Sequence, residues 1–268
     1  MGIRRGLEFA QLTDVGLVRE RNEDSFGYWE PENEAEFQKK GRLAVVADGM
    51  GGHEGGEMAS EIAVQTLCEI YRESPEAEPS QALSEALREA HQRIRAFAEE
   101  HPEYRNMGTT CTAAVVRGDL LWFAHVGDSR LYLFRGGRLR RLTRDHSYVN
   151  QLLESGVITS AEAEHHPQRN VLTSALGIGR NGASFETSAQ PVQIQAGDTL
   201  LLCTDGLWGL VGELEMIDTV AAHSPDDACR VLVDKARERG GPDNITVEIL
   251  RVVSLEPAAA AAPVPDGA

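Results

Sequence analysis

The sequence predicts an α+β domain in which helices cover antiparallel sheets. Apolar, strand-like runs follow one another through short turns in the middle of the chain, and two pairs of amphipathic helices lie between strand segments. A doubly wound parallel fold would instead alternate strand and helix along the chain. The 268 residues, 41% of them hydrophobic, suffice for one large domain or two small ones, and we favour one.

The first hundred residues combine strands with a pair of helices. We predict strands at 7–13 and 42–47, followed by helices at 57–73 and 80–100. The glycines between residues 49 and 56 predict a loop before the first helix. The second helix has apolar residues at alternating spacings of four and three, with Ser80 as its expected N-cap. Two consecutive helices between strands indicate a helical layer on a sheet.

The rest of the chain is richer in strands. We predict strands at 111–117, 120–126, 130–135, 138–142, 185–194, 198–204 and 245–253, and helices at 213–222 and 225–238. Only Gly136 and Gly137 separate two of these strands, which is typical of a tight hairpin. Ser224-Pro225 has the composition of a helix start. The middle strands therefore form a meander and not a repeated strand–helix–strand unit.

Residues 145–177 interrupt the strand pattern. A short helix near 147–155 ends at Gly156, and Thr159 with Glu162 has the spacing of a capping box. We interpret this segment as a small excursion from a domain that spans residues 1–253. An Ala/Pro-rich stretch at 254–268 has the composition of a disordered tail or linker.

The charge of the chain argues against two classes of partner. Acidic residues number 42 against 26 Lys and Arg, for a formal charge of −16, whereas proteins that bind nucleic acid present a basic surface. Attraction to anionic membranes is disfavoured for the same reason. No apolar run approaches the roughly 20 residues of a membrane span, and the first residues lack the apolar stretch of a signal peptide. We expect a cytoplasmic protein.

Three apolar runs each end in an aspartate beside a glycine. They are 43–49, 120–128 and 199–206, with the carboxylates of Asp48, Asp128 and Asp205. A carboxylate at the end of a buried strand is costly to desolvate without a cation. Glu23-Asp24 and Asp243 are further acidic positions in turns rich in Gly or Asn. Oxygen donors collected from distant segments favour Mg²⁺ or Mn²⁺ over zinc.

Six ordered motifs resemble the metal-dependent protein phosphatases of type 2C, and bacterial members in particular. They are residues 19–24, 47–53, 108–110, 126–130, 204–208 and 243–246. One Asp-Gly pair means little, but six motifs in order across residues 10–252 are specific. The resemblance implies a four-layer α/β/β/α sandwich around a central antiparallel β-sandwich, with a mobile flap at about 145–177. It also implies hydrolysis of phosphoserine and phosphothreonine in proteins, with two core Mn²⁺ or Mg²⁺ ions.

The resemblance assigns the core ligands position by position. It implies that Asp48 bridges two ions and that the Gly49 carbonyl binds the second of them. It places Asp205 and Asp243 on the first ion. Since Asp-Gly and Asp-Asn pairs also simply form turns, the order of the motifs carries this assignment.

The remaining roles also come from the resemblance. Glu23 and Asp24 match an acidic pair near the second ion, with an exposed polar turn as the alternative. Arg19 matches the arginine that binds the substrate phosphate, because a guanidinium fork suits two phosphate oxygens; the alternative is a surface salt bridge. Asp128, with Asp205, matches a third-metal site, unless its carboxylate only caps the turn that follows it.

The charges then predict a mechanism. Two neighbouring divalent ions activate a bridging water and bind the phosphoryl oxygens for in-line displacement, without a covalent intermediate. Met50 stands where eukaryotic members have a histidine, and methionine cannot donate a proton to the leaving group. A metal-bound water is the preferred general acid, and His53 is the alternative.

Several functions remain open from the sequence. The first is a monomeric serine/threonine phosphatase that opposes a bacterial kinase and acts on phosphorylated proteins, the kinase among them. The second keeps the chemistry but narrows the substrate to one phosphorylated regulator. The third is a pseudo-enzyme that binds phosphoproteins without hydrolysis, although every implied metal-ligand side chain is acidic.

Overall fold

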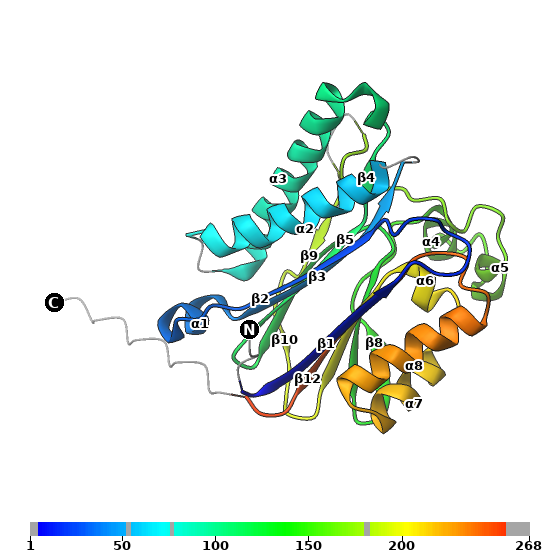
Figure 1. Cartoon of the computed structure of the whole chain (residues 1–268). Coiled ribbons are helices and arrows are strands. Elements are labelled where there is room, and N and C mark those ends of the chain that lie inside the picture. The colour runs from blue at the N-terminus through cyan, green and yellow to red at the C-terminus, as the bar shows by residue number, and fades with distance from the viewer. Residues whose placement is uncertain (1–4, 52–54, 76–77, 180–182, 256–268) are drawn as a thin grey trace.

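Two antiparallel sheets lie face to face in the computed structural model, and helices cover the outer face of each (Figure 1). The structure describes residues 5–51, 55–75, 78–179 and 183–255. The layers run helix, sheet, sheet, helix, so the predicted α+β class and the α/β/β/α sandwich are confirmed. In the described part of the chain, no helix is both long and apolar enough to cross a membrane.

The first sheet contains both ends of the described chain. Its strand order is β1 (Leu7–Asp14), β12 (Ile245–Val252), β11 (Thr199–Cys203), β7 (Arg130–Arg135) and β8 (Arg138–Arg141). Helices α7 (Glu213–Ala222) and α8 (Pro225–Glu238) cover its outer face, where Leu232 packs among Tyr132, Leu201 and Ile249. At the predicted helix start, Ser224 caps α8 by accepting a hydrogen bond from the Asp227 amide.

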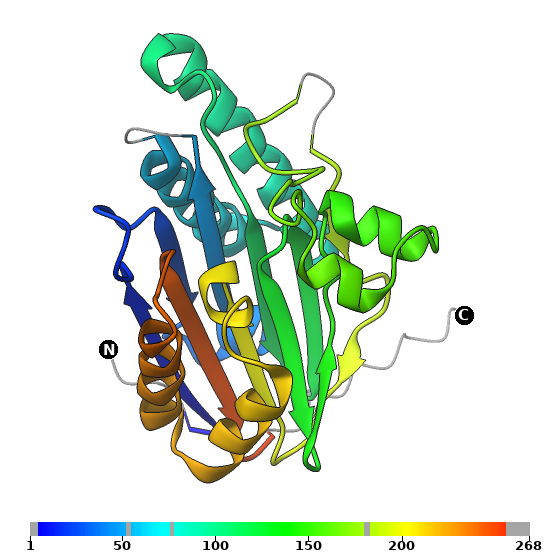
Figure 2. The same cartoon turned by 90° about the vertical axis from the view of Figure 1, so that its right-hand side faces the viewer.

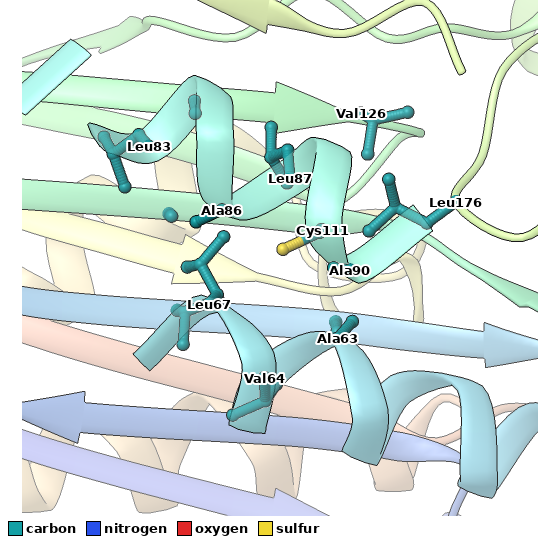
Figure 3. Close-up of a cluster of buried hydrophobic side chains, with 14 of the residues drawn as sticks. Ala63, Val64, Leu67, Leu83, Ala86, Leu87, Ala90, Cys111, Val126 and Leu176 are labelled. Atoms are coloured by element: carbon teal, nitrogen blue, oxygen red, sulfur yellow. The ribbon is translucent and has the colours of Figure 1, made fainter. Parts of the chain in front are cut away.

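The second sheet supports the longer helices. Its central order is β10 (Val192–Gln193), β6 (Leu120–Val126), β5 (Cys111–Arg117), β3 (Arg42–Met50) and β2 (Asp24–Trp29), with β4 (Gly108–Thr109) on β3 and β9 (Glu186–Thr187) on β6. Helices α2 (Gly55–Glu73) and α3 (Pro79–Glu100) pack on it, followed by the 3₁₀ turn η1 (Pro102–Tyr104). Figure 3 shows their apolar side chains interdigitating above the strands. The short α1 (Glu34–Lys40) lies between β2 and β3 in the sequence.

Strand alternation determines which residues face the space between the sheets. In β3, Val45 and Ala47 pack under the helices, whereas Ala44 and Val46 join the core between the sheets. By the same alternation, Asp48 lies on the side of β3 that carries Ala44 and Val46 and faces the other sheet. It therefore lies at the end of the space between the sheets, and this end is where the candidate site forms.

Most predicted elements are present, but some predictions were wrong. The single strand at 185–194 is instead two short strands, β9 and β10, and Pro191, which has no amide hydrogen, precedes the second. Ser80 does not cap α3, because Pro79 already occupies the first turn and Glu78 is the N-cap. Five elements were not predicted: β2, α1, η1, β4 and the one-turn helix α6 (Asp205–Trp208).

The segment 145–177 leaves the sandwich and returns to it, and we call it the flap. It contains α4 (Tyr148–Glu154) and α5 (Ser160–Glu164), and both hydrogen bonds of the predicted capping box between Thr159 and Glu162 are present. Figure 2 shows these helices beside the open end of the sheets. All but the first two residues of the predicted tail, 254–268, lie outside the described residues.

Candidate active site

A pocket of about 1210 Å³ opens at the end of the space between the sheets. Of the eight predicted site residues, seven line it: Arg19, Glu23, Asp48, Gly49, Asp128, Asp205 and Asp243. Asp24 is not among the lining residues and lies behind the pocket wall. Segments up to 224 residues apart in the sequence thus contribute to one cavity.

The antiparallel topology explains why these residues meet. Asp48 lies near the end of β3, directly opposite Asp24 at the start of β2. Asp205 follows β11, and Asp243 precedes the neighbouring strand β12. Because adjacent antiparallel strands run in opposite directions, the end of one strand lies beside the start of the next. All four carboxylates therefore lie at the same edge.

The motif Gly108-Thr109-Thr110 positions the backbone of Asp48. The amide of Asp48 donates to the Thr110 hydroxyl at 2.9 Å, and its carbonyl accepts from the Thr109 hydroxyl at 2.9 Å. The hydroxyls of Thr110 and Ser129 are hydrogen-bonded to each other at 2.7 Å, which links this strand to the turn that contains Asp128. The sequence located this motif, but its part in positioning Asp48 required the contacts.

Gly49 occupies a place where no side chain fits. A Cβ at this position would lie 2.0 Å from the carbonyl oxygen of Gly56 and 2.6 Å from that of Glu23. The amide of Gly49 donates to the Glu23 carbonyl at 3.1 Å. A Cβ on Gly56 would in turn lie 2.7 Å from the carboxyl carbon of Glu23. The two glycines therefore bring the first turn of α2 against Glu23, where the positive end of the helix dipole favours a carboxylate.

Asp24 joins strand ends from both sheets. Its Oδ2 accepts hydrogen bonds from the hydroxyls of Thr204 at 2.8 Å and Thr246 at 2.6 Å. Its Oδ1 is buried and has no hydrogen-bond partner among the described residues. Burial raises the pKa of Asp24 to about 7, and the two hydroxyls offset only part of that effect. One oxygen is therefore committed to structure, and only the other is left for a water or a cation.

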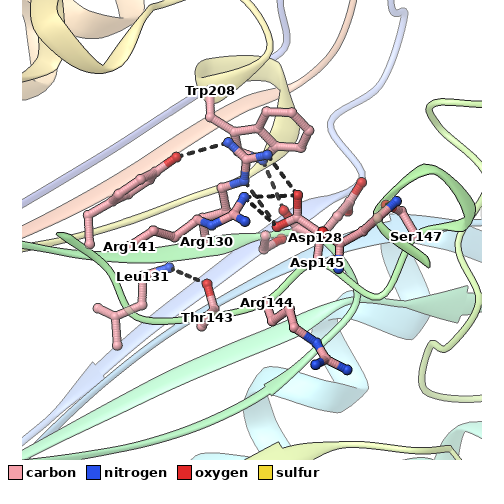
Figure 4. Close-up of polar contacts among 12 residues, drawn as sticks. Asp128, Arg130, Leu131, Arg141, Thr143, Arg144, Asp145, Ser147 and Trp208 are labelled. Atoms are coloured by element: carbon pink, nitrogen blue, oxygen red, sulfur yellow. Dashed lines mark hydrogen bonds and ion pairs between the residues drawn. The ribbon is translucent and has the colours of Figure 1, made fainter. Parts of the chain in front are cut away.

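Asp128 belongs to a rigid polar cluster (Figure 4). Its carbonyl accepts a hydrogen bond from Trp208 Nε1 at 2.9 Å, and the Arg130 guanidinium stacks 3.5 Å from the centre of a Trp208 ring. Arg130 also binds both oxygens of Asp145, at 3.1 and 2.7 Å. Among the described residues, the Asp128 carboxylate receives no hydrogen bond from the amides of Ser129 or Arg130. These are the contacts that the alternative interpretation, in which Asp128 only caps the following turn, would require.

The carboxylates raise one another's pKa. For Asp48, burial is the main cause and the charges of Asp24 and Asp205 add to it. Burial and Asp243 raise the pKa of Asp205 to about 6. The pKa of Asp128 is raised by burial and then by Asp205. Such a cluster is stabilised in its charged form by cations, which makes it suited to binding them.

The donor set fits Mn²⁺ or Mg²⁺. The described residues that line the pocket include no histidine or cysteine, and Asp205 Oδ1 is buried without a hydrogen bond. Oxygen-only donors suit these two ions. In the described part of the chain, no three acidic, histidine or cysteine side chains close on one point as a finished ligand shell would. The carboxylates instead surround the cavity.

Arg19 forms an ion pair with one of these acids. Its Nη2 lies 2.8 Å from Asp243 Oδ2, and 46% of the Arg19 side chain is exposed. The other oxygen of Asp243 accepts from the Asn244 amide at 2.9 Å. Arg19 thus forms a salt bridge, as the alternative to phosphate binding supposed. Its partner, Asp243, is itself a predicted metal ligand, and both residues line the pocket. An arginine in this place is available to both a carboxylate and a substrate phosphate.

The residue at the position of the missing histidine, Met50, lines the pocket. The alternative general acid, His53, lies outside the described residues.

Comparisons with known proteins agree with this geometry. Residues 18–234 match the family model described as protein phosphatase 2C. The serine/threonine phosphatase stp of Listeria welshimeri is 39% identical over 240 residues, which cover 88% of this chain and 92% of that protein. The structure of the S. agalactiae serine/threonine phosphatase has a TM-score of 0.83 at 33% identity and covers 92% of this chain and 99% of its own. The catalytic domain of PstP, described as a complex with two manganese ions, has a TM-score of 0.78 at 33% identity, with the same two coverages. The chain belongs to the protein phosphatase 2C family.

Proposed function

We propose that this protein hydrolyses phosphoserine and phosphothreonine in other proteins, using divalent ions held by the carboxylates of the pocket. The observation that carries the proposal is the convergence of Asp48, Asp128, Asp205, Asp243 and Arg19 on one cavity. Membership of the protein phosphatase 2C family and the similarity to named serine/threonine phosphatases support the same activity.

We assign the residues as follows. Asp48, Asp205 and Asp243 would hold a first ion, and Asp48 together with the Gly49 carbonyl would hold a second. When bound, the divalent ions lower the pKa of a coordinated water and offset the charge on the phosphoryl oxygens. Glu23 lies beside the second site at the start of α2, and Asp24 holds the strand ends in place behind it.

Arg19 binds the phosphate in this scheme. Its guanidinium turns from Asp243 toward the phosphoryl oxygens when substrate enters, and it can contact two of them at once. Asp128 is held through its backbone carbonyl and lines the pocket, so we propose that it holds a third ion together with Asp205. Mn²⁺ is the ion named for the PstP structure, and the oxygen donors here suit Mg²⁺ as well.

The test is hydrolysis of p-nitrophenyl phosphate and of a phosphothreonine peptide by metal-free protein with added Mn²⁺, Mg²⁺ or Zn²⁺. We expect turnover with Mn²⁺ at least equal to that with Mg²⁺, and its loss in excess EDTA. Turnover that persists in EDTA, or that requires zinc alone, would contradict the proposal. A phosphoprotein that binds without being hydrolysed would instead support the pseudo-enzyme alternative.

The proposal extends to the oligomeric state, location and substrates of the enzyme. We propose one catalytic domain over residues 1–253 that acts as a monomer in the cytoplasm and opposes a Ser/Thr kinase, itself one of the substrates. Sedimentation at several protein concentrations tests the monomer. Comparing the phosphoproteins of a strain with and without the gene tests the substrates.

A further inference from the structure

The pocket extends beyond the proposed metal and phosphate residues. Those residues line the part at the ends of the sheets. A second part, which we call the side arm, is lined by Met50, Tyr104, Leu172, Ile178 and Ala183. The side arm is continuous with the metal end, since all of these residues line one cavity of about 1210 Å³.

Three side-arm residues surround the backbone of Met107 and Gly108. Met50 pairs with Gly108 across the β3–β4 ladder. Ile178 packs against Gly108 so closely that a Cβ there would lie 2.6 Å from Ile178 Cγ1. The Tyr104 carbonyl accepts a hydrogen bond from the Met107 amide at 2.8 Å. The apolar wall is therefore formed by three separate segments that meet at one place.

Both sides of this wall are anchored. The Tyr104 ring stacks on Phe97 of α3 with the ring centres 5.7 Å apart. On the other side, the Leu176 amide donates to the Thr109 carbonyl at 2.9 Å, two residues before Ile178. Leu176 itself is buried in the core beneath α2 and α3 (Figure 3). Tyr104 is therefore fixed by its contact with α3, and the segment before Ile178 is fixed by its hydrogen bonds to β4.

The five side-arm residues form an apolar wall within a lining that also contains the polar residues Asn170, Thr173, Ser174 and Ser184. Ile178 is 45% exposed, although it is a large aliphatic side chain. Glu103, next to Tyr104 in the chain, also lines the pocket, and its side chain is 63% exposed. Covering Ile178 and its neighbours with another apolar group would be favourable, since apolar area is removed from water.

We propose that the side arm binds an aliphatic or aromatic side chain of the substrate protein, one or two residues from the phosphorylated serine or threonine. This inference rests on the proposed function. Consecutive Cα atoms are about 3.8 Å apart, so the nearest neighbours of a phosphoresidue bound at the metal end must pass through the same cavity. The apolar wall selects among them, whereas a small phosphate ester has no neighbouring residue to place against it.

Paired phosphothreonine peptides test this inference. The two peptides of a pair differ at one position, where one has Leu and the other Ala. The position lies one or two residues before or after the phosphothreonine, so four pairs cover all the choices. For each peptide, and for p-nitrophenyl phosphate, kcat/KM is measured with Mn²⁺. We expect one position at which Leu is preferred about tenfold, the size of effect that an apolar pocket gives for small differences in side chain. Ile178→Ala and Tyr104→Ala should each bring that ratio close to one and leave p-nitrophenyl phosphate hydrolysis unchanged.

Val171→Ala is the matched control. Val171 is an aliphatic residue of the flap and, like Ile178, is 45% exposed, but it does not line the pocket, so this variant should keep the wild-type preference. Equal rates for all peptides with the wild type, or a Leu preference that survives both side-arm substitutions, would overturn the inference while the proposed function stood. Wild-type protein that hydrolyses neither peptides nor p-nitrophenyl phosphate would contradict the proposed function, and the side-arm role would fall with it.

Discussion

In the proposed mechanism, Arg19 and Asp243 connect the binding of phosphate to the binding of metal. The ion pair between them joins the loop after β1 to the start of β12, and it occupies an oxygen that a cation would also use. A guanidinium that leaves Asp243 for the substrate exposes that oxygen to the ion. We infer that Arg19 competes with metal for Asp243 when no substrate is bound.

Replacing Arg19 separates these roles. Arg19→Ala should raise KM for p-nitrophenyl phosphate roughly 10- to 100-fold, the usual worth of hydrogen bonds to a charged group. Affinity for Mn²⁺ should be unchanged or higher, because Asp243 loses a competitor. Arg19→Lys is the matched control, since it keeps the charge without the fork. Unchanged KM together with weaker Mn²⁺ binding would show that Arg19 is a structural partner of Asp243 only.

At the scale of single residues, the sequence predicts the site better than its surroundings. Asp48 and Asp205 follow apolar runs that can be recognised without a structure, because a carboxylate at the end of a buried strand is unusual. Asp24 was assigned to a turn, whereas it begins a strand. That strand contains Gly27, where a Cβ would lie 2.8 Å from a Val64 methyl carbon of α2. Only the packed helix explains why glycine stands in this strand.

Among the elements, the flap shows two different kinds of attachment. Its helices α4 and α5 have no fully buried described side chain. Its returning end is fixed, because the amide and carbonyl of Leu176 both bond to Thr109 and the Gly177 amide donates to His91 Nδ1 at 3.1 Å. The sequence predicted one loosely held segment through residue 177. The anchor could not be predicted, since the contact with α3 spans 86 residues.

Hydrogen exchange should resolve these two parts. Amides in 148–168 are expected to exchange fastest within the flap, because few buried contacts oppose local opening. The amide of Leu176 should exchange at a rate closer to that of β11. Uniform protection across the flap would contradict this division.

The flap helices can also be removed. Replacing residues 157–167 by a short Gly/Ser loop should change kcat/KM for phosphoproteins more than for p-nitrophenyl phosphate, because only a large substrate reaches beyond the pocket. Mn²⁺ affinity serves as the control for intact folding. Equal losses for both substrates with normal metal binding would show that this part of the flap does not select substrates.

For the whole molecule, the two sheets enclose an unusual carboxyl group. Glu248 on β12 is fully buried, and neither of its oxygens has a hydrogen-bond partner among the described residues. Burial raises its pKa well above the ordinary value. Burial between the sheets therefore favours the neutral form of Glu248 over its charged form more strongly than water does.

This burial predicts a stability that falls as pH rises. Below about pH 4 both the folded and the unfolded chain keep the proton on Glu248. Between the unfolded pKa and the folded pKa of Glu248, only the unfolded chain releases the proton. Over this range, each pH unit lowers the free energy of unfolding by roughly 1.4 kcal/mol. Glu248→Leu should therefore increase the free energy of unfolding at pH 8 by more than at pH 4.5, measured by urea denaturation in EDTA. The same difference at both pH values would contradict a neutral buried Glu248.

The sandwich itself illustrates what the sequence cannot supply. Local patterns predict most strands, but the pairing of β1 with β12 joins residues more than 230 positions apart, as the Thr13–Thr246 hydrogen bond shows. Such pairing depends on the two sheets and their helices packing together. The four-layer arrangement was predicted through family resemblance, which supplied this long-range information.

Manganese binding and turnover, measured on the same samples of wild type and Asp48→Asn, test the central claim most directly. We predict that the metal-free wild type binds at least two Mn²⁺ ions by calorimetric titration and gains phosphothreonine-peptide hydrolysis as they bind. Asp48→Asn should lose at least one ion and about 10³-fold in kcat, because it removes the proposed bridge between the sites. A variant that keeps both the full number of ions and the wild-type turnover would contradict the account.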